Sequence, residues 1–140
     1  MVGRKYRAIE CLKYFNARQP YPVLKFKLVN LAREEYPEEL IAPVDTGFEG
    51  CLLVTREIYD FVKVGELPKS SWRVYRTLAG TITMRSARAF IVVGNQKLPV
   101  IVETPYFGLG KLLIGRCVLN RLILILDGVS KETCLAEPLS

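Results

Sequence analysis

The stretch Val44-Asp45-Thr46-Gly47 decides how the rest of this sequence is interpreted. It follows Leu40-Ile41-Ala42-Pro43, an apolar run that predicts a short strand ending in a turn. A carboxylate just beyond a strand can act as a general base toward water. The threonine can orient a neighbouring group by hydrogen bonding, and the glycine lets another backbone approach closely. The alternative is an ordinary turn, because Asp-x-Gly sequences are common where strands end.

A second informative stretch is Leu112-Leu113-Ile114-Gly115-Arg116-Cys117. Three aliphatic residues, a glycine and an arginine precede a short helical pattern, and alone they are equally compatible with a core strand and a turn. The nearby Gly108-Leu109-Gly110-Lys111 lacks the spacing of the GxxxxGK[ST] phosphate loop. We therefore do not interpret it as a nucleotide site.

Together, Val44-Asp45-Thr46-Gly47 and the later Leu113-Ile114-Gly115-Arg116 resemble the motifs of the retroviral-type (retropepsin-like) aspartic proteases. Phe48 makes the first motif similar to that of the prokaryotic and archaeal clan AA group, which reads Asp-Thr-Gly-Phe. The resemblance covers roughly residues 24–128. It implies an all-β, acid-protease-like closed barrel with one or two short helices and one lobe per chain.

The resemblance also implies a role for each residue of the first motif. Asp45 matches the catalytic aspartate. Thr46 matches the residue that hydrogen-bonds across the dimer axis beneath the two aspartates, and Gly47 matches the glycine whose carbonyl contacts the substrate backbone. Phe48 follows directly and is expected to line the substrate groove.

Glu49 falls where viral members carry a second acid. The resemblance implies that it pairs with Arg116 and shapes the groove, whereas the alternative is an ordinary surface pair of little energetic value. Ile114 and Gly115 match the hydrophobic-Gly element that packs behind the catalytic loop, and we also place Ile114 among the groove residues. The flap is expected between the two motifs, over residues 75–84. Its tip is expected at Thr77-Leu78-Ala79-Gly80-Thr81, where Gly80 suits a hairpin turn. Within this tip, Leu78, Ala79 and Gly80 would contribute to the groove. Trp72 and Tyr75 could line the pocket or belong to the core.

Short strands dominate the rest of the chain. Residues 24–28 and 81–85 alternate apolar and polar side chains, which predicts half-buried strands. Residues 89–93 and 98–102 flank a turn and predict a hairpin, with Pro99 at an edge or a strand start. Thr55 is a good N-cap for a helix that ends near Gly65, and a second short helix is expected from Arg116 to about residue 122. We expect a single domain over residues 1–140, with an N-terminal strand or extension over 1–20 and a turn-rich tail over 129–140.

Composition excludes several classes of chemistry. The 140 residues contain no histidine, so Ser-His and Cys-His nucleophile systems and the common zinc sites cannot form. We expect no metal and no cofactor. Cys11, Cys51, Cys117 and Cys134 show no CxxC spacing and are interpreted as buried thiols, with disulfides as the alternative. The basic N-terminus is followed by no apolar h-region, and no apolar run is long enough for a membrane span, so we expect a cytoplasmic protein.

The chain holds one Asp-Thr-Gly, and Asp127-Gly128 is a poor second copy because it lacks the threonine. An aspartic protease needs two carboxylates that share a proton. A homodimer with twofold symmetry would supply both copies of Asp45, and its substrate would be a peptide or protein.

Two other functions stay open. The same fold could serve as a non-catalytic module for dimerisation or peptide binding. The net charge of +6 also allows a basic β-barrel that binds nucleic acid, although the chain lacks clustered basic residues interleaved with exposed aromatic residues. A solvated basic surface explains the charge equally well.

Overall fold

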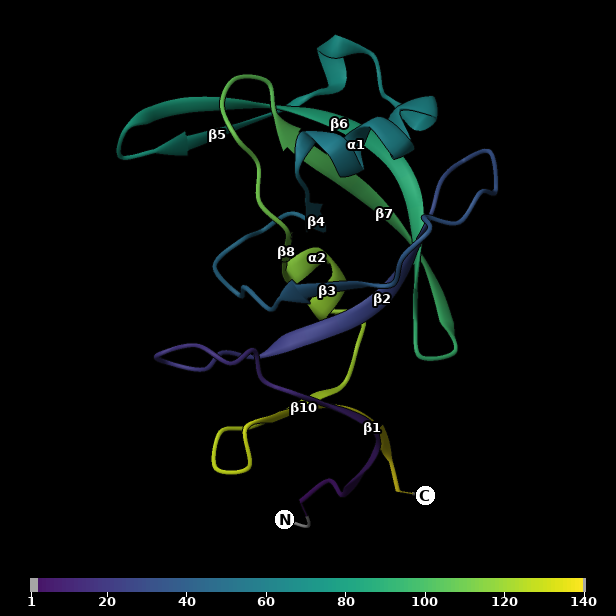
Figure 1. Cartoon of the computed structure of the whole chain (residues 1–140), viewed down its shortest axis with the longest axis vertical. Helices are drawn as coiled ribbons and strands as arrows, with labels where there is room; N and C mark the ends of the chain where they lie inside the picture. The colour runs from purple at the N-terminus through teal and green to yellow at the C-terminus, as the bar shows by residue number, and fades with distance from the viewer. Residues whose placement is uncertain (1–2, 140) are drawn as a thin grey trace.

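The computed structural model describes residues 3–139, and most of this chain is β-structure (Figure 1). The strands are β1 (Tyr6–Lys13), β2 (Val23–Val29), β3 (Leu40–Pro43), β4 (Leu52–Leu53), β5 (Arg73–Thr77), β6 (Gly80–Val93), β7 (Gln96–Pro105), β8 (Leu113–Ile114), β9 (Leu124–Asp127) and β10 (Glu132–Pro138). The helices are α1 (Arg56–Val62) and α2 (Arg116–Leu119), with two 3-10 turns at Lys63–Gly65 and Lys69–Ser71. The predicted mainly β fold with short helices is therefore confirmed.

Seven strands form the main sheet. Six of them follow the order β3-β2-β6-β7-β4-β8, and β5 pairs with the outer part of β6. An isolated parallel bridge between Val44 and Ile114 joins the two ends of this order. The parallel pairing of β4 with β7 brings Leu52 opposite Val102 and Leu53 opposite Glu103. The two sequence motifs thus meet where the two ends of the sheet approach each other.

The long hairpin of β6 and β7 forms the back of the molecule (Figure 1). Its turn lies at Gly94, whose φ of 59° suits glycine. Pro99 is the fourth residue of β7 and pairs with Phe90 of β6. The second partner of β7 is β4, which pairs with Val102 and Glu103 only, so Pro99 lies where β7 has one neighbouring strand. Proline has no N–H to donate, and it is tolerated here because β7 has a single neighbouring strand at this point, although Pro99 is not at the start of the strand.

The two ends of the chain form a separate three-stranded sheet in the order β1-β10-β9. The predicted turn-rich tail over 129–140 is therefore wrong from Glu132 to Pro138, which form β10. The sequence misleads here because β10 mixes polar and apolar residues without a clean alternation, and its partner β1 is far away in sequence. A disulfide between Cys11 and Cys134 joins these two strands. Residues 1, 2 and 140 of the predicted extension and tail lie outside the described residues.

The helix predicted from Thr55 is confirmed. The Thr55 hydroxyl accepts a hydrogen bond from the Ile58 N–H at 3.4 Å, and the 3-10 turn that follows α1 ends at Gly65. A Cβ at Gly65 would collide with the Arg88 carbonyl, so glycine is required where this segment crosses β6. No helix among residues 3–139 has the length and apolar character needed to span a bilayer.

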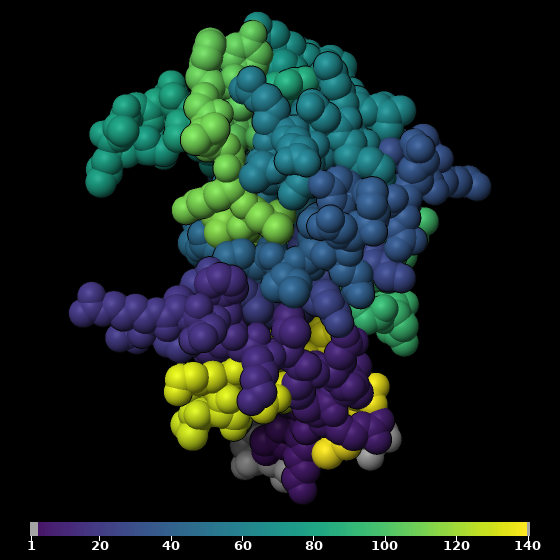
Figure 2. Space-filling model, viewed as in Figure 1, coloured from purple at the N-terminus to yellow at the C-terminus, as the bar shows by residue number. Residues whose placement is uncertain are grey.

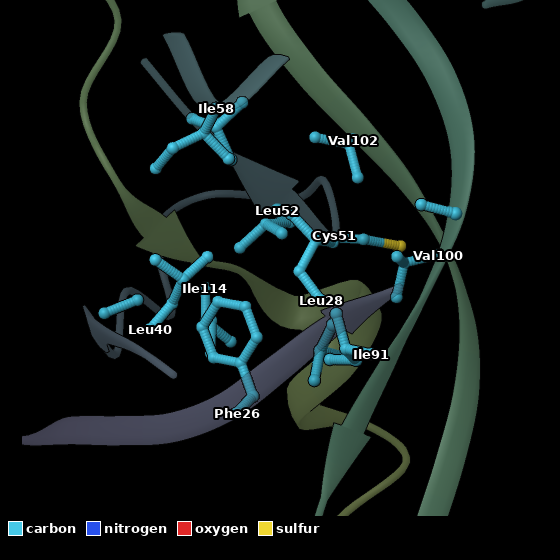
Figure 3. Packing of buried hydrophobic residues seen from close by; sticks show 14 of the residues in the cluster. Phe26, Leu28, Leu40, Cys51, Leu52, Ile58, Ile91, Val100, Val102 and Ile114 are labelled. Atoms are coloured by element: carbon cyan, nitrogen blue, oxygen red, sulfur yellow. The ribbon is translucent and has the colours of Figure 1, made fainter. Parts of the chain in front are cut away.

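One apolar core lies inside the main sheet (Figure 3). Phe26 and Leu28 of β2 point inward with Lys27 between them, as the alternation predicts. Leu52 and Ile114 are fully buried beside them. The same cluster therefore fixes the strands that carry both motifs.

Candidate active site

The loop that carries Asp45 is fixed where it leaves β3. The Val44 N–H donates to the Pro22 carbonyl at 3.1 Å, and the Asp45 N–H donates to the Ile114 carbonyl at 2.8 Å. Both bonds use backbone atoms, so they hold the Asp45 Cα in place whatever its side chain does. We define residues 44–50 as the catalytic loop.

The Asp45 side chain takes part in the turn itself. Its Oδ1 accepts a hydrogen bond from the Gly47 N–H at 2.8 Å, and the Phe48 N–H donates to the Asp45 carbonyl at 3.2 Å. Asp45 is partly exposed, while Thr46 and Gly47 are exposed. The structure thus places the three residues of the predicted motif in one tight turn, with the carboxylate accessible from solvent.

The segment after β8 supports the loop from behind. The Arg116 N–H donates to the Phe48 carbonyl at 2.8 Å, and the Cys117 N–H donates to the Gly50 carbonyl at 3.2 Å. Gly115 lies so close to these two carbonyls that a Cβ there would collide with both. The predicted position of Gly115 behind the catalytic loop is what the structure shows.

The interpretation of the cysteines as thiols is wrong. Cys51, which directly follows the catalytic loop, forms a disulfide with Cys117 of α2. Spacing in the sequence could not reveal this pair, because β4, β7 and β8 must assemble before the two side chains meet. The disulfide fastens the loop to α2 in addition to the backbone bonds.

Two predicted side-chain roles are not supported. Within residues 3–139, Glu49 and Arg116 form no ion pair. Arg116 instead supports the loop through its backbone N–H, and the charge of Glu49 acts on Arg73 and Glu103. Ile114 is 0% exposed and belongs to the core, so its side chain cannot line a groove.

The predicted flap is a real hairpin. β5 pairs with the start of β6, from Arg73 opposite Met84 to Thr77 opposite Gly80. Leu78 and Ala79 form its tip, and Gly80 has a φ of 115° that favours glycine. The Thr77 hydroxyl accepts from the Ala79 N–H at 3.2 Å and donates to the Gly80 carbonyl at 2.8 Å. Leu78 is fully exposed, so its side chain is available for contact with another molecule.

The flap and the catalytic loop lie on the same side of the molecule. Figure 1 shows the β5–β6 tip projecting from the side where the β3–β4 loop turns. In the space-filling view the surface is hollowed between the flap and the projecting hairpin that joins β1 to β2 (Figure 2). The segment between β7 and β8 borders this hollow and carries Phe107 and Leu109, which are 83% and 99% exposed. The hollow is open on one side.

A second concave region lies elsewhere. An open pocket of about 580 Å³ borders the Cys51–Cys117 disulfide and the hairpin of β6 and β7. Its lining includes no residue of the catalytic loop or of the flap tip; the residues are Leu31, Cys51, Arg88, Ala89, Phe90, Pro99, Val100, Ile101, Cys117 and Arg121. It is distinct from the hollow beside Asp45.

Sequence reasoning missed one residue behind the loop altogether. Glu103 of β7 is 0% exposed, and burial raises the pKa of its carboxyl above the usual value. The Tyr75 hydroxyl lies 2.8 Å from its Oε1 and 3.1 Å from its Oε2. Burial, together with the bond to Glu103, raises the pKa of Tyr75 to about 12, so this phenol keeps its proton. The available signal was a lone acid directly after the apolar run Val100-Ile101-Val102.

The described residues contain one group with the donors for a metal ion, and its chemistry does not fit. Cys11, Glu132 and Cys134 bring their ligand atoms together in the terminal sheet. The two sulfurs are joined in a disulfide, so they offer no thiolate. This group lies in the terminal sheet, away from Asp45.

The chain is thus a mainly β lobe with one Asp-Thr-Gly turn and a hairpin whose Tyr75 packs against Phe48 of the catalytic loop. The fold is similar to that of a retropepsin-like aspartic protease from Rickettsia conorii, known from its crystal structure. The comparison has a TM-score of 0.57 and 15% sequence identity, and it covers 100% of this chain and 98% of that chain. No protein-family model and no curated protein matches the sequence. The comparison shows a shared fold, in agreement with the predicted acid-protease-like architecture.

Proposed function

We propose that this protein is a homodimeric aspartic endopeptidase in which each chain contributes Asp45 to one shared active site. The observation that carries the proposal is the Asp45 turn. Its backbone is held to Ile114, its carboxylate is accessible, and it lies on the side of the molecule from which the flap projects. This arrangement presents a carboxylate to a ligand and does not bury it as a structural acid.

The dimer follows from the chemistry that one carboxylate cannot perform. Two carboxyl groups about 3 Å apart cannot both ionise, so one stays protonated and the other charged. The charged Asp45 would take a proton from water, while the protonated Asp45 would polarise the scissile carbonyl. The water adds, a tetrahedral diol forms, and a proton passes to the leaving amine. The two carboxyl groups titrate as a pair.

Two features support a second copy as the missing half. The hollow beside the catalytic loop is open on one side, so one chain forms part of a groove. Thr46 and Gly47 are exposed on the accessible side of the turn, where a symmetry-related turn could meet them. A twofold axis beside Asp45 would complete both the carboxyl pair and the groove.

The substrate is proposed to be a peptide with apolar side chains. Leu78 of the flap tip and Phe107 and Leu109 of the segment bordering the hollow are exposed. Exposed apolar side chains grouped around a hollow mark a binding surface. The fit is to an extended chain, because a hairpin and a turn offer backbone groups on both sides.

The test is cleavage of an unstructured peptide library from acid to neutral pH, with sedimentation of the same samples. Asp45→Asn should lower kcat by at least about 10²–10⁴-fold while the dimer persists. Asp60→Asn, an exposed acid on α1, is the matched control and should leave cleavage unchanged. A monomeric wild type that cleaves peptides would contradict the shared site. A wild-type dimer that binds peptides and never cleaves them would favour the binding module.

A further inference from the structure

The buried carboxyl of Glu103 has no part in the chemistry assigned to Asp45. It lies on β7 opposite Leu53 of β4 and Ser86 of β6, in the interior of the main sheet. Its Oε1 lies beneath the catalytic loop, where a Cβ added to Gly50 would contact it at 2.5 Å. Placing a carboxyl group in such a position is costly unless it is hydrogen-bonded. An apolar residue would fill the same place without that cost, so the carboxyl needs an explanation.

The partner of this carboxyl comes from the flap. Tyr75 is in the middle of β5, and its hydroxyl donates to Glu103. The oxygen of the same hydroxyl accepts a hydrogen bond from Arg73 Nη1 at 3.3 Å. The Tyr75 ring packs against the ring of Phe48, with 6.0 Å between the ring centroids. One side chain of the flap therefore contacts both the catalytic loop and the acid behind it.

Little else holds β5 to the body of the molecule. Its strand partner is β6, and the part of β6 that pairs with β5, from Gly80 to Met84, belongs to the flap itself. Val74 is 61% exposed, and Arg73, Arg76 and Thr77 are also exposed. At the base of the flap the Trp72 indole N–H donates to the Leu67 carbonyl at 2.9 Å. Between that base and the tip, Tyr75 is the residue of β5 that reaches inward.

We propose that Glu103 is a positioning residue that holds Tyr75, and with it the first strand of the flap, at a fixed height above the catalytic loop. Glu103 would thereby govern how tightly substrate is bound and take no part in bond cleavage. The proposal rests on the proposed function for its enzymatic consequence. Its structural content, a side-chain link between flap and loop, stands without it.

The surroundings of Glu103 act on its charge in opposite directions. The groups that act on it are Tyr75 and Arg73 from β5 and Glu49 from the catalytic loop. A hydrogen bond to an ionised carboxylate is about twice as strong as one between neutral groups. Arg73 stabilises the ionised form, whereas burial and Glu49 oppose it. The link is therefore expected to weaken when Glu103 gains a proton.

The first experiment separates binding from chemistry. Tyr75→Phe keeps the ring on Phe48 and removes the hydroxyl, so KM should rise about tenfold while kcat stays within about twofold. Glu103→Gln keeps the shape and one acceptor oxygen, so it should have a smaller effect. The double variant should be no worse than Tyr75→Phe, because both changes act on the same hydrogen bond. Val74→Ala, exposed on the same strand, is the control and should change neither constant.

Amide hydrogen exchange gives a second readout that needs no activity. Tyr75→Phe should speed exchange across residues 73–83, while Val74→Ala should not. If the wild type proves inactive on every peptide, the proposed function fails, and this exchange pattern still decides whether the link exists. Unchanged KM and unchanged exchange in Tyr75→Phe would overturn the proposal. So would a fall in kcat equal to the fall in kcat/KM, because that pattern marks a role in the chemical step.

Discussion

The catalytic loop and the flap are held in place by different means. The loop is fixed by backbone hydrogen bonds to Ile114, Arg116 and Cys117, by a disulfide, and by close packing against Gly115. The flap is a two-stranded hairpin whose side chains are largely exposed, and Tyr75 links it to the interior. In the proposed enzyme, a rigid loop would suit a carboxylate that has to meet its partner within a fraction of an ångström, and a lightly held hairpin would suit an element that has to open.

The largest stability effects should come from the two disulfides, of which Cys51–Cys117 lies behind the loop. A Cys51→Ala/Cys117→Ala double variant should lose about 2–4 kcal/mol of unfolding free energy, because the bond closes a long chain segment. Urea denaturation measures this loss. The matched control is Cys11→Ala/Cys134→Ala in the terminal sheet, which should lose a similar amount.

The two disulfide variants should differ in where they loosen the molecule. Removing Cys51–Cys117 should speed hydrogen exchange in residues 44–50, and removing Cys11–Cys134 should leave that segment unchanged. Equal exchange in both variants would show that backbone bonds alone hold the loop, which would weaken the contrast with the flap.

The second effect tests close packing at one glycine. Gly115→Ala should destabilise the protein by about 1–3 kcal/mol, because the new methyl group meets the carbonyls of Phe48 and Gly50 and neither can move aside cheaply. Gly128→Ala is the matched control, since a Cβ there has open space, and it should stay within about 0.5 kcal/mol. Thermal unfolding of both variants measures the difference. Equal melting temperatures would mean that the loop yields more easily than its contacts indicate.

The rigid region is also the one that the sequence describes best. The apolar run before Asp45, the turn itself and the glycine behind it are local signals, and each of them predicted the observed structure. The position of the flap and the cap at Thr55 were predictable for the same reason. Short-range chemistry fixes these features.

The features that the sequence concealed all depend on contacts between distant segments. The strand β10 exists because β1 pairs with it, and neither disulfide can be assigned without the sheet order. Among residues 3–139 Glu49 forms no ion pair with Arg116, whose bond to the loop comes from its backbone N–H. Glu103 lies 28 residues after Tyr75 in the chain, with β6 between them. Its burial and its hydrogen-bond partner therefore appear only in the folded structure.

The third prediction concerns pH and the link between the two regions. Burial raises the pKa of Glu103 above its ordinary value of 4.5, so the folded protein holds this proton more tightly than the unfolded chain. Its contribution to stability is fully present below 4.5 and is lost as the pH rises through the folded pKa. The stability of the wild type relative to Glu103→Gln should therefore decline as the pH rises from about 4.5.

Urea denaturation of both proteins across this pH range measures the difference. Glu38→Gln, an exposed acid, is the control and should show no such decline relative to wild type. A stability difference between wild type and Glu103→Gln that is constant with pH would show that the buried carboxyl does not titrate there.

The smallest effect on stability is expected at the tip of the flap. Leu78 is fully exposed, so Leu78→Ser removes no contact of the folded chain and should change the unfolding free energy by less than about 0.5 kcal/mol. If the tip closes on an apolar peptide, Leu78→Ser removes the apolar contact between the tip and the peptide, and KM should rise about tenfold. Val129→Ser, exposed in the turn between β9 and β10, is the matched control and should alter neither quantity. Because the free protein is unaffected, a rise in KM at Leu78 alone can come only from contact with substrate or with the facing flap, and an unchanged KM would mean that the flap tip does not close over the peptide.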